Sequence, residues 1–212
     1  MERGGMTAMK KELLYFNIGD SFGGNQDWFH NFLMHMGGCA AATACDSCIY
    51  FALHRDVRDL YPFDVSHITK EDYETFAMKM KPYLRPRAGG IKKLTIYMDG
   101  LCKYLQNLGK GDFISMEGFS GDHSYDEAAS FIIALIDQGY PIPYLMLKHT
   151  DCKFKDFSWH WFLLVGYEQS ESDVLVTAAS YGKATVFSLR ELWHTGYEEK
   201  GGMIRYQLNN PV

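Results

Sequence analysis

The chain has 212 residues, of which 47% are hydrophobic and 22% charged, and its formal net charge is −5. This balance is typical of one folded domain with a substantial core, and it excludes a disordered chain. Basic residues gather nowhere densely enough to follow a nucleic-acid backbone. The densest group is interrupted by two prolines, as in a solvated loop, and consists of Lys79, Lys81, Arg85 and Arg87.

The N-terminal segment MERGGMTAMKKELLYF lacks the apolar run that a signal peptide needs. No window of the chain approaches the roughly 18 apolar residues of a membrane span. Five cysteines without a signal peptide favour free thiols over disulfides. We therefore expect a cytoplasmic protein with no nucleic-acid and no membrane partner.

The first part of the chain, about residues 17–138, is predicted to be mainly helical. A short strand-like run over 13–16 leads into a Gly-rich stretch, and the alanine-rich run over 39–54 then predicts a central, mostly buried helix. Three further helices are expected, and their boundaries are marked by Thr69 and Pro82, by Leu94 and Gly109, and by a capping box of Ser124 and Glu127.

From Gly139 onward the hydrophobic period changes to that of strands. A short helix begins at Ser188 within this part, by the same capping pattern. Helices followed by short strands with tight turns predict one α+β domain over 1–212, with a helical half (about 17–138) and an antiparallel sheet half (about 139–210). The five expected strands are 142–148, 161–168, 174–178, 184–188 and 203–208.

Cys39 is the first candidate for chemistry. It follows Gly37-Gly38 and precedes the alanine-rich helix, so its sulfur is expected in the first helical turn. Unpaired backbone N–H groups and the helix dipole favour a thiolate there. A buried cysteine is also a common small core residue, so Cys39 alone does not decide between a nucleophile and packing.

His160 opens the strand His160-Trp-Phe-Leu-Leu-Val-Gly166-Tyr167. This run resembles the strand of papain-like cysteine peptidases in which the catalytic histidine is followed, six and seven residues on, by Gly-Tyr. That family also places its cysteine at the start of a long central helix far upstream, and a sheet follows the histidine. The resemblance covers residues 23–54 and 139–208 and is greatest to bacterial double-glycine (bacteriocin-leader) peptidase-like domains.

The segment Ala179-Ser180-Tyr181-Gly182 resembles the family's Asn-Ser-Trp-Gly, in which the asparagine orients the histidine. Ala179 stands where that asparagine would be, and alanine cannot hold an imidazole. The nearest candidates to replace it are Ser180 and Thr177. Loss of the third group weakens catalysis without necessarily abolishing it.

Gln26 is the only glutamine upstream of Cys39, and the resemblance implies that it donates to the oxyanion together with the Cys39 N–H. It lies 13 residues before Cys39, about twice the family's usual gap, so an ordinary surface amide is equally compatible with the sequence.

Two other patterns favour structural roles. Cys45 and Cys48 form a C-x-x-C inside the expected helix, where packing is favoured, and there is no second pair for zinc. Asp122, His123 and Asp126 flank a helix cap and are not expected to bind a metal. We therefore expect neither metal nor cofactor.

The resemblance implies a papain-like α+β hydrolase acting on a peptide or a small amide or acyl substrate through a Cys39–His160 dyad. Two alternatives remain open from the sequence. The dyad could transfer an acyl group to an amine, or the domain could be an inactive peptide-binding module, which the missing asparagine permits. Residues 55–138 carry no motif and are expected to shape the substrate cleft.

Overall fold

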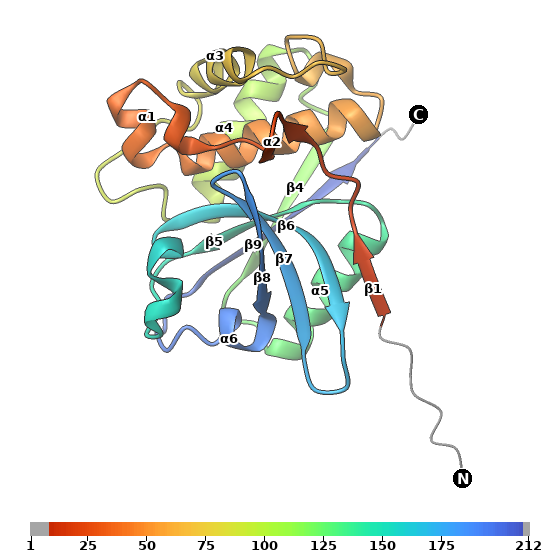
Figure 1. Cartoon of the computed structure of the whole chain (residues 1–212), viewed down its shortest axis with the longest axis vertical. Helices are drawn as coiled ribbons and strands as arrows, with labels where there is room; N and C mark the ends of the chain where they lie inside the picture. The colour runs from red at the N-terminus through yellow and green to blue at the C-terminus, as the bar shows by residue number, and fades with distance from the viewer. Residues whose placement is uncertain (1–8, 210–212) are drawn as a thin grey trace.

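The computed structural model describes residues 9–209 and has the α+β architecture that the sequence predicts (Figure 1). Residues 1–8 and 210–212 belong to the expected domain, and the first eight to the N-terminal segment considered above, but they lie outside the described residues. None of the helices within 9–209 has the length and apolar character needed to cross a bilayer.

One antiparallel sheet forms the centre of the molecule (Figure 1). The five strands expected after Gly139 are all present in it, with boundaries shifted by at most two residues. Its order is β4 (Ile114–Ser120), β9 (Gly201–Leu208), β5 (Ile142–Met146), β6 (His160–Gln169), β7 (Val174–Ser180) and β8 (Lys183–Ser188), and β1 (Met9–Glu12) also pairs with β6. A separate hairpin joins β2 (Asn17–Ile18) to β3 (Ser21–Phe22).

Most helices precede the sheet strands in the chain, and α1 to α4 lie together on one side of it (Figure 1). The α-helices are α1 (Phe32–Gly37), α2 (Cys39–His54), α3 (Lys70–Met80), α4 (Leu94–Asn107), α5 (Tyr125–Asp137) and α6 (Leu189–Trp193). Three short 3-10 helices are η1 (Gln26–Trp28), η2 (Arg58–Leu60) and η3 (Cys152–Phe157).

The predicted helix caps are confirmed. The side chain of Thr69 accepts from the Asp72 N–H at the start of α3, and Ser188 accepts from the Glu191 N–H at the start of α6. Ser124 and Glu127 form the expected capping box at α5. These caps satisfy N–H groups that the first helical turn leaves unpaired, so the local sequence defines these boundaries.

Two predictions about the first part of the chain are wrong, and one helix was missed. Residues 114–120 are the edge strand β4 rather than part of a helical segment, because they pair with β9 almost ninety residues later. Residues 13–16 are not a strand, although the Leu13 N–H still donates to the Val165 carbonyl. The short helix α1, between the Gly-rich stretch and Cys39, was not expected.

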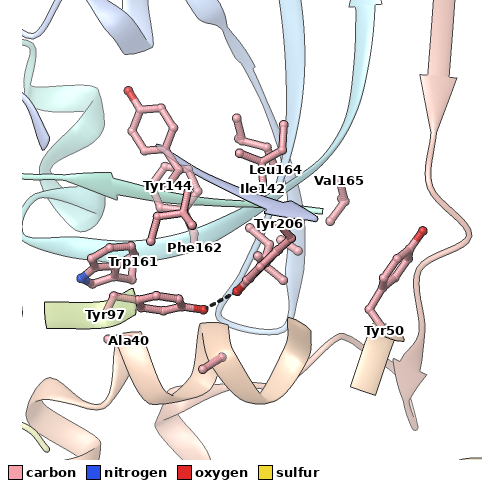
Figure 2. Packing of buried hydrophobic residues seen from close by; sticks show 14 of the residues in the cluster. Ala40, Tyr50, Tyr97, Ile142, Tyr144, Trp161, Phe162, Leu164, Val165 and Tyr206 are labelled. Carbon is pink, nitrogen blue, oxygen red and sulfur yellow. Dashed lines mark hydrogen bonds between the residues drawn. The ribbon is translucent and has the colours of Figure 1, made fainter. Parts of the chain in front are cut away.

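Both faces of strand β6 are covered, which explains its continuous apolar run. Trp161 stacks on Tyr97 of α4 on one face, with ring centroids 4.6 Å apart, while Phe162 stacks on Tyr144 on the other (Figure 2). Helix α2 packs on the Trp161 side, and every residue of it except Ala42, Leu53 and His54 is buried. Its small alanines permit this close approach.

A buried chain of hydroxyls connects helix α4, the sheet and helix α2. The hydroxyls of Tyr97 and Tyr206 lie 2.9 Å apart (Figure 2). Tyr206 donates to Ser47 Oγ at 3.0 Å. Ser47 in turn donates to the Thr43 carbonyl at 2.8 Å. Each of these buried hydroxyls thus has a hydrogen-bond partner.

We expect Tyr206→Phe to lower the free energy of unfolding by about 1–3 kcal/mol, because it leaves the Tyr97 hydroxyl buried without a partner. The double variant Tyr97→Phe/Tyr206→Phe should cost about the same as Tyr206→Phe alone, since the orphaned hydroxyl is then gone. Urea unfolding of the two single variants and the double variant measures this. If the double variant loses as much stability as the two single variants together, the two hydroxyls are not coupled.

Candidate active site

Cys39 is the first residue of α2 and is 6% exposed. Burial raises the pKa of its thiol, while the backbone N–H groups of Trp161, Ala40 and Cys39 itself act in the opposite direction. The helix start therefore favours the thiolate as the sequence predicts, but desolvation outweighs it. In the free protein, burial therefore favours the neutral thiol of Cys39.

His160 is the first residue of β6 and is held by two hydroxyl groups. Its Nε2 lies 2.7 Å from Ser180 Oγ, and its Nδ1 lies 3.3 Å from the hydroxyl of Tyr181. The imidazole also stacks on the Tyr181 ring at 4.6 Å, with an interplanar angle of 5°. Burial lowers the pKa of His160 to about 3, so the ring is neutral at neutral pH.

The structure brings Cys39 and His160 together although 121 positions separate them in the sequence. Both line a small cavity of about 20 Å³, enough for one water molecule, and both line an open groove of about 780 Å³. Trp161, whose N–H acts on the Cys39 thiol, directly follows His160 in β6. Helix α2 and strand β6 therefore contribute to the same site.

Gln26 lies beside the pair, in η1, and lines both the cavity and the groove. It is 8% exposed, so it is not an ordinary surface amide. Its Nε2 donates to the His35 carbonyl at 2.7 Å, and its Oε1 is buried without a hydrogen-bond partner. The long gap before Cys39 is taken up by η1 and α1, which return the chain to the start of α2.

Of the two candidates to replace the missing asparagine, only Ser180 contacts the imidazole. Thr177 donates to Glu12 Oε1 at 2.7 Å instead. Ala179 is buried and lines the small cavity next to Ser180. The hydroxyl at 180 therefore holds the ring from the position that follows the family's asparagine.

Asp46 was missed by the sequence reasoning. It lies seven positions after Cys39 on α2, two turns along the same face, and lines the same small cavity. Its carboxyl accepts from the hydroxyls of Tyr15 at 2.7 Å and Tyr73 at 2.8 Å, and from the Gly24 N–H at 3.2 Å. The helical spacing from Cys39 was the available signal. Burial raises the pKa of Asp46 to about 6, against the effect of these donors.

The remaining cysteines and acids do not form a second centre. Cys45 and Cys48 are buried within α2, and burial raises the pKa of both thiols, as expected for packing residues. Within residues 9–209, no group of three or more His, Cys, Asp or Glu side chains is arranged to hold a metal ion. His123 instead lies 3.3 Å from Glu127 at the start of α5.

No protein-family model, curated protein or solved structure matches the chain.

Iodoacetamide labelling of Cys39 should accelerate with pH up to and beyond pH 9.0, the ordinary pKa of a cysteine, because burial favours the thiol. The exposed Cys152 provides the internal control, and peptide mapping separates the two sites. A Cys39 rate that is already constant between about pH 6 and pH 8 would show a thiolate and contradict this assignment.

We expect Asp46 to make stability depend on pH. Its pKa of about 6 in the folded state lies above the ordinary 3.8, so between these values the folded protein keeps a proton that the unfolded chain has released. The resulting stabilisation is complete below pH 3.8 and is lost as the pH rises through 6. From pH 4 to pH 7, the free energy of unfolding should fall by about 2 kcal/mol more in the wild type than in Asp46→Asn.

Urea unfolding of both proteins at a series of pH values gives this difference. His160 is present in both, so its own titration cancels. A difference that does not change with pH would show that the pKa of Asp46 is the same in the folded and unfolded states.

Proposed function

We propose that the chain is a cysteine peptidase-like hydrolase with a papain-like architecture, which cleaves a peptide or amide bond. The carrying observation is that Cys39, at the start of a buried helix, and His160, at the start of a sheet strand, line one cavity that opens into a groove. A helix that bears the thiol on one side and a strand that bears the imidazole on the other is the arrangement that the sequence resemblance implies.

His160 acts as the general base. With the ring hydrogen on Nε2, His160 donates it to Ser180 Oγ at 2.7 Å, and the lone pair of the imidazole is on Nδ1. Nδ1 thus presents a lone pair, as a base for a neutral thiol requires. Because the pKa of the buried ring is low, His160 is neutral before the substrate binds and can accept the thiol proton.

The reaction proceeds by acyl transfer through Cys39. The sulfur attacks the substrate carbonyl carbon while the thiol proton passes to His160 Nδ1, and the C–N bond then breaks as the amine leaves with that proton. Water attacks the resulting thioester, gives its proton to Nδ1, and releases the acid as the Cys39 thiol is restored.

The developing oxyanion is stabilised at the start of α2. The Cys39 backbone N–H has no helical partner because it belongs to the first turn. Gln26 uses one amide hydrogen on the His35 carbonyl and keeps a second for the substrate oxygen. Fixed donors of this kind act strongly in a buried site, where water does not compete.

A second candidate function is an inactive peptide-binding module. The burial of both groups favours it, since burial raises the pKa of the Cys39 thiol and lowers that of the His160 imidazole, and so opposes ionisation of either group. Internally quenched peptide libraries distinguish the two. The hydrolase proposal predicts cleavage by the wild type and none by Cys39→Ala, whereas the binding module predicts no cleavage by either.

Ser180 takes the third catalytic role, by orienting His160. We expect Ser180→Ala to lower kcat by about 10- to 100-fold with little change in KM, because the aim of the imidazole matters most in the transition state. Adding Ala179→Asn to this variant should restore part of the loss by supplying an amide from the adjacent position.

The matched control is Thr177→Val, which removes a nearby hydroxyl that bonds Glu12 and not His160. Steady-state kinetics on one cleaved peptide measures all four proteins. Equal activity of Ser180→Ala and the wild type would show that another group orients the ring.

A further inference from the structure

The groove beside Cys39 and His160 is lined by two cations and by no carboxylate, in a chain whose net charge is −5. Helix α1 contributes Leu33 and Met36 to the lining. The loop from Pro86 to Lys92 contributes both cations, and Trp159 also lines the groove. The groove is therefore positively charged, whereas the protein as a whole is negatively charged.

The two cations, Arg87 and Lys92, are exposed and have no ion-pair partner among residues 9–209. The Lys92 ammonium lies 4.4 Å above the centre of the Trp159 ring, so its position is set by a cation–π contact and an anion can still reach it. An unpaired guanidinium and an ammonium in the same loop favour a carboxylate ligand.

The groove also has apolar side chains that are open to solvent. Leu33 is 48% exposed and Met36 is 67% exposed, and Trp159 adds a ring that is 38% exposed. Trp159 also has a φ of +57°, a left-handed backbone conformation that a non-glycine residue adopts only at an energetic cost. Exposed apolar side chains gathered along one groove are typical of a surface that contacts a ligand.

The loop that carries the cations is held to the catalytic strand. The indole N–H of Trp161 donates to the Ile91 carbonyl at 2.7 Å, and the Gly90 N–H closes a turn onto the Arg87 carbonyl at 2.9 Å. Gly89 has a φ of +78°, and a Cβ there would lie 2.9 Å from the Lys92 ammonium. The backbone of this loop is therefore kept at a fixed place relative to the strand that begins at His160.

We propose that this groove selects acidic peptide substrates, in which a Glu or Asp side chain pairs with Arg87 and Lys92 and a neighbouring apolar side chain packs on Leu33 and Met36. This inference rests on the proposed function of the same site, since the peptide would lie across Cys39. The charge of the groove, and not the chemistry of the dyad, determines which peptides are accepted.

Equilibrium binding to Cys39→Ala tests this without requiring turnover. The probes are fluorescein-labelled hexapeptides with one Leu and one Glu at every relative position, each matched by a peptide with Gln in place of Glu. The best Glu peptide should bind roughly five- to tenfold more tightly than its Gln counterpart in fluorescence polarisation at low salt. The preference should disappear at high salt.

Charge reversal locates the effect. Arg87→Glu/Lys92→Glu should remove or invert the preference, and the milder Arg87→Gln/Lys92→Gln should remove it. Lys93→Glu, the matched control, changes an exposed lysine next to Lys92 that does not line the groove and should keep it. Circular dichroism confirms that each variant is folded.

Three results would overturn the inference: equal or absent binding of Glu and Gln peptides, an equal effect of Lys93→Glu, or equally good competition by a single-stranded oligonucleotide. Failure of the hydrolase proposal gives a different result from failure of this inference. A Glu preference that depends on Arg87 and Lys92, without any cleavage by the wild type, supports the acidic-peptide groove and rejects the peptidase.

Discussion

The carboxyl group of Asp46 accepts hydrogen bonds from Tyr15, Tyr73 and the Gly24 N–H in the interior of the protein. It thereby joins helix α2 to helix α3 and to the Gly-rich stretch that leads to Gln26. Burial of a carboxyl without such donors costs several kcal/mol, so these segments are stable only in this arrangement. A Cβ on Gly24 would lie 1.9 Å from Tyr73, which explains the glycine. Because Cys39 is two turns earlier on α2, the same contacts fix Gln26 relative to the thiol.

Elements whose signals are local could be predicted from the sequence. The alanine-rich run gave α2 with the boundaries observed, and Thr69 and Ser124 marked helix starts because a capping side chain acts within its own turn. Strand β4 could not be predicted in this way. Its sequence ISMEGFS has a weak pattern and becomes a strand only through pairing with β9, which depends on how distant parts of the chain meet.

For the candidate site too, the sequence predicted which residues take part but not the properties that depend on the folded surroundings. The sequence singled out Cys39, His160 and Gln26, and all three line one cavity. It could not give the direction of the Cys39 pKa, because that depends on the balance between three backbone N–H groups and desolvation in the folded protein. Nor could it choose Ser180 over Thr177, two residues of one strand that differ in which neighbour their hydroxyl meets.

Backbone strain is concentrated around the imidazole. Of the three non-glycine residues with positive φ between positions 9 and 209, Trp159 precedes His160 and Tyr181 stacks on it. Tyr181 and Gly182 form the two-residue turn between β7 and β8, where Asn-Gly is the preferred pair because both positions are left-handed. Asparagine at 181 would favour the turn but would remove the ring that covers His160 and the hydroxyl that faces Nδ1. Turn stability does not account for the tyrosine, whereas a requirement to hold a neutral imidazole next to a thiol does.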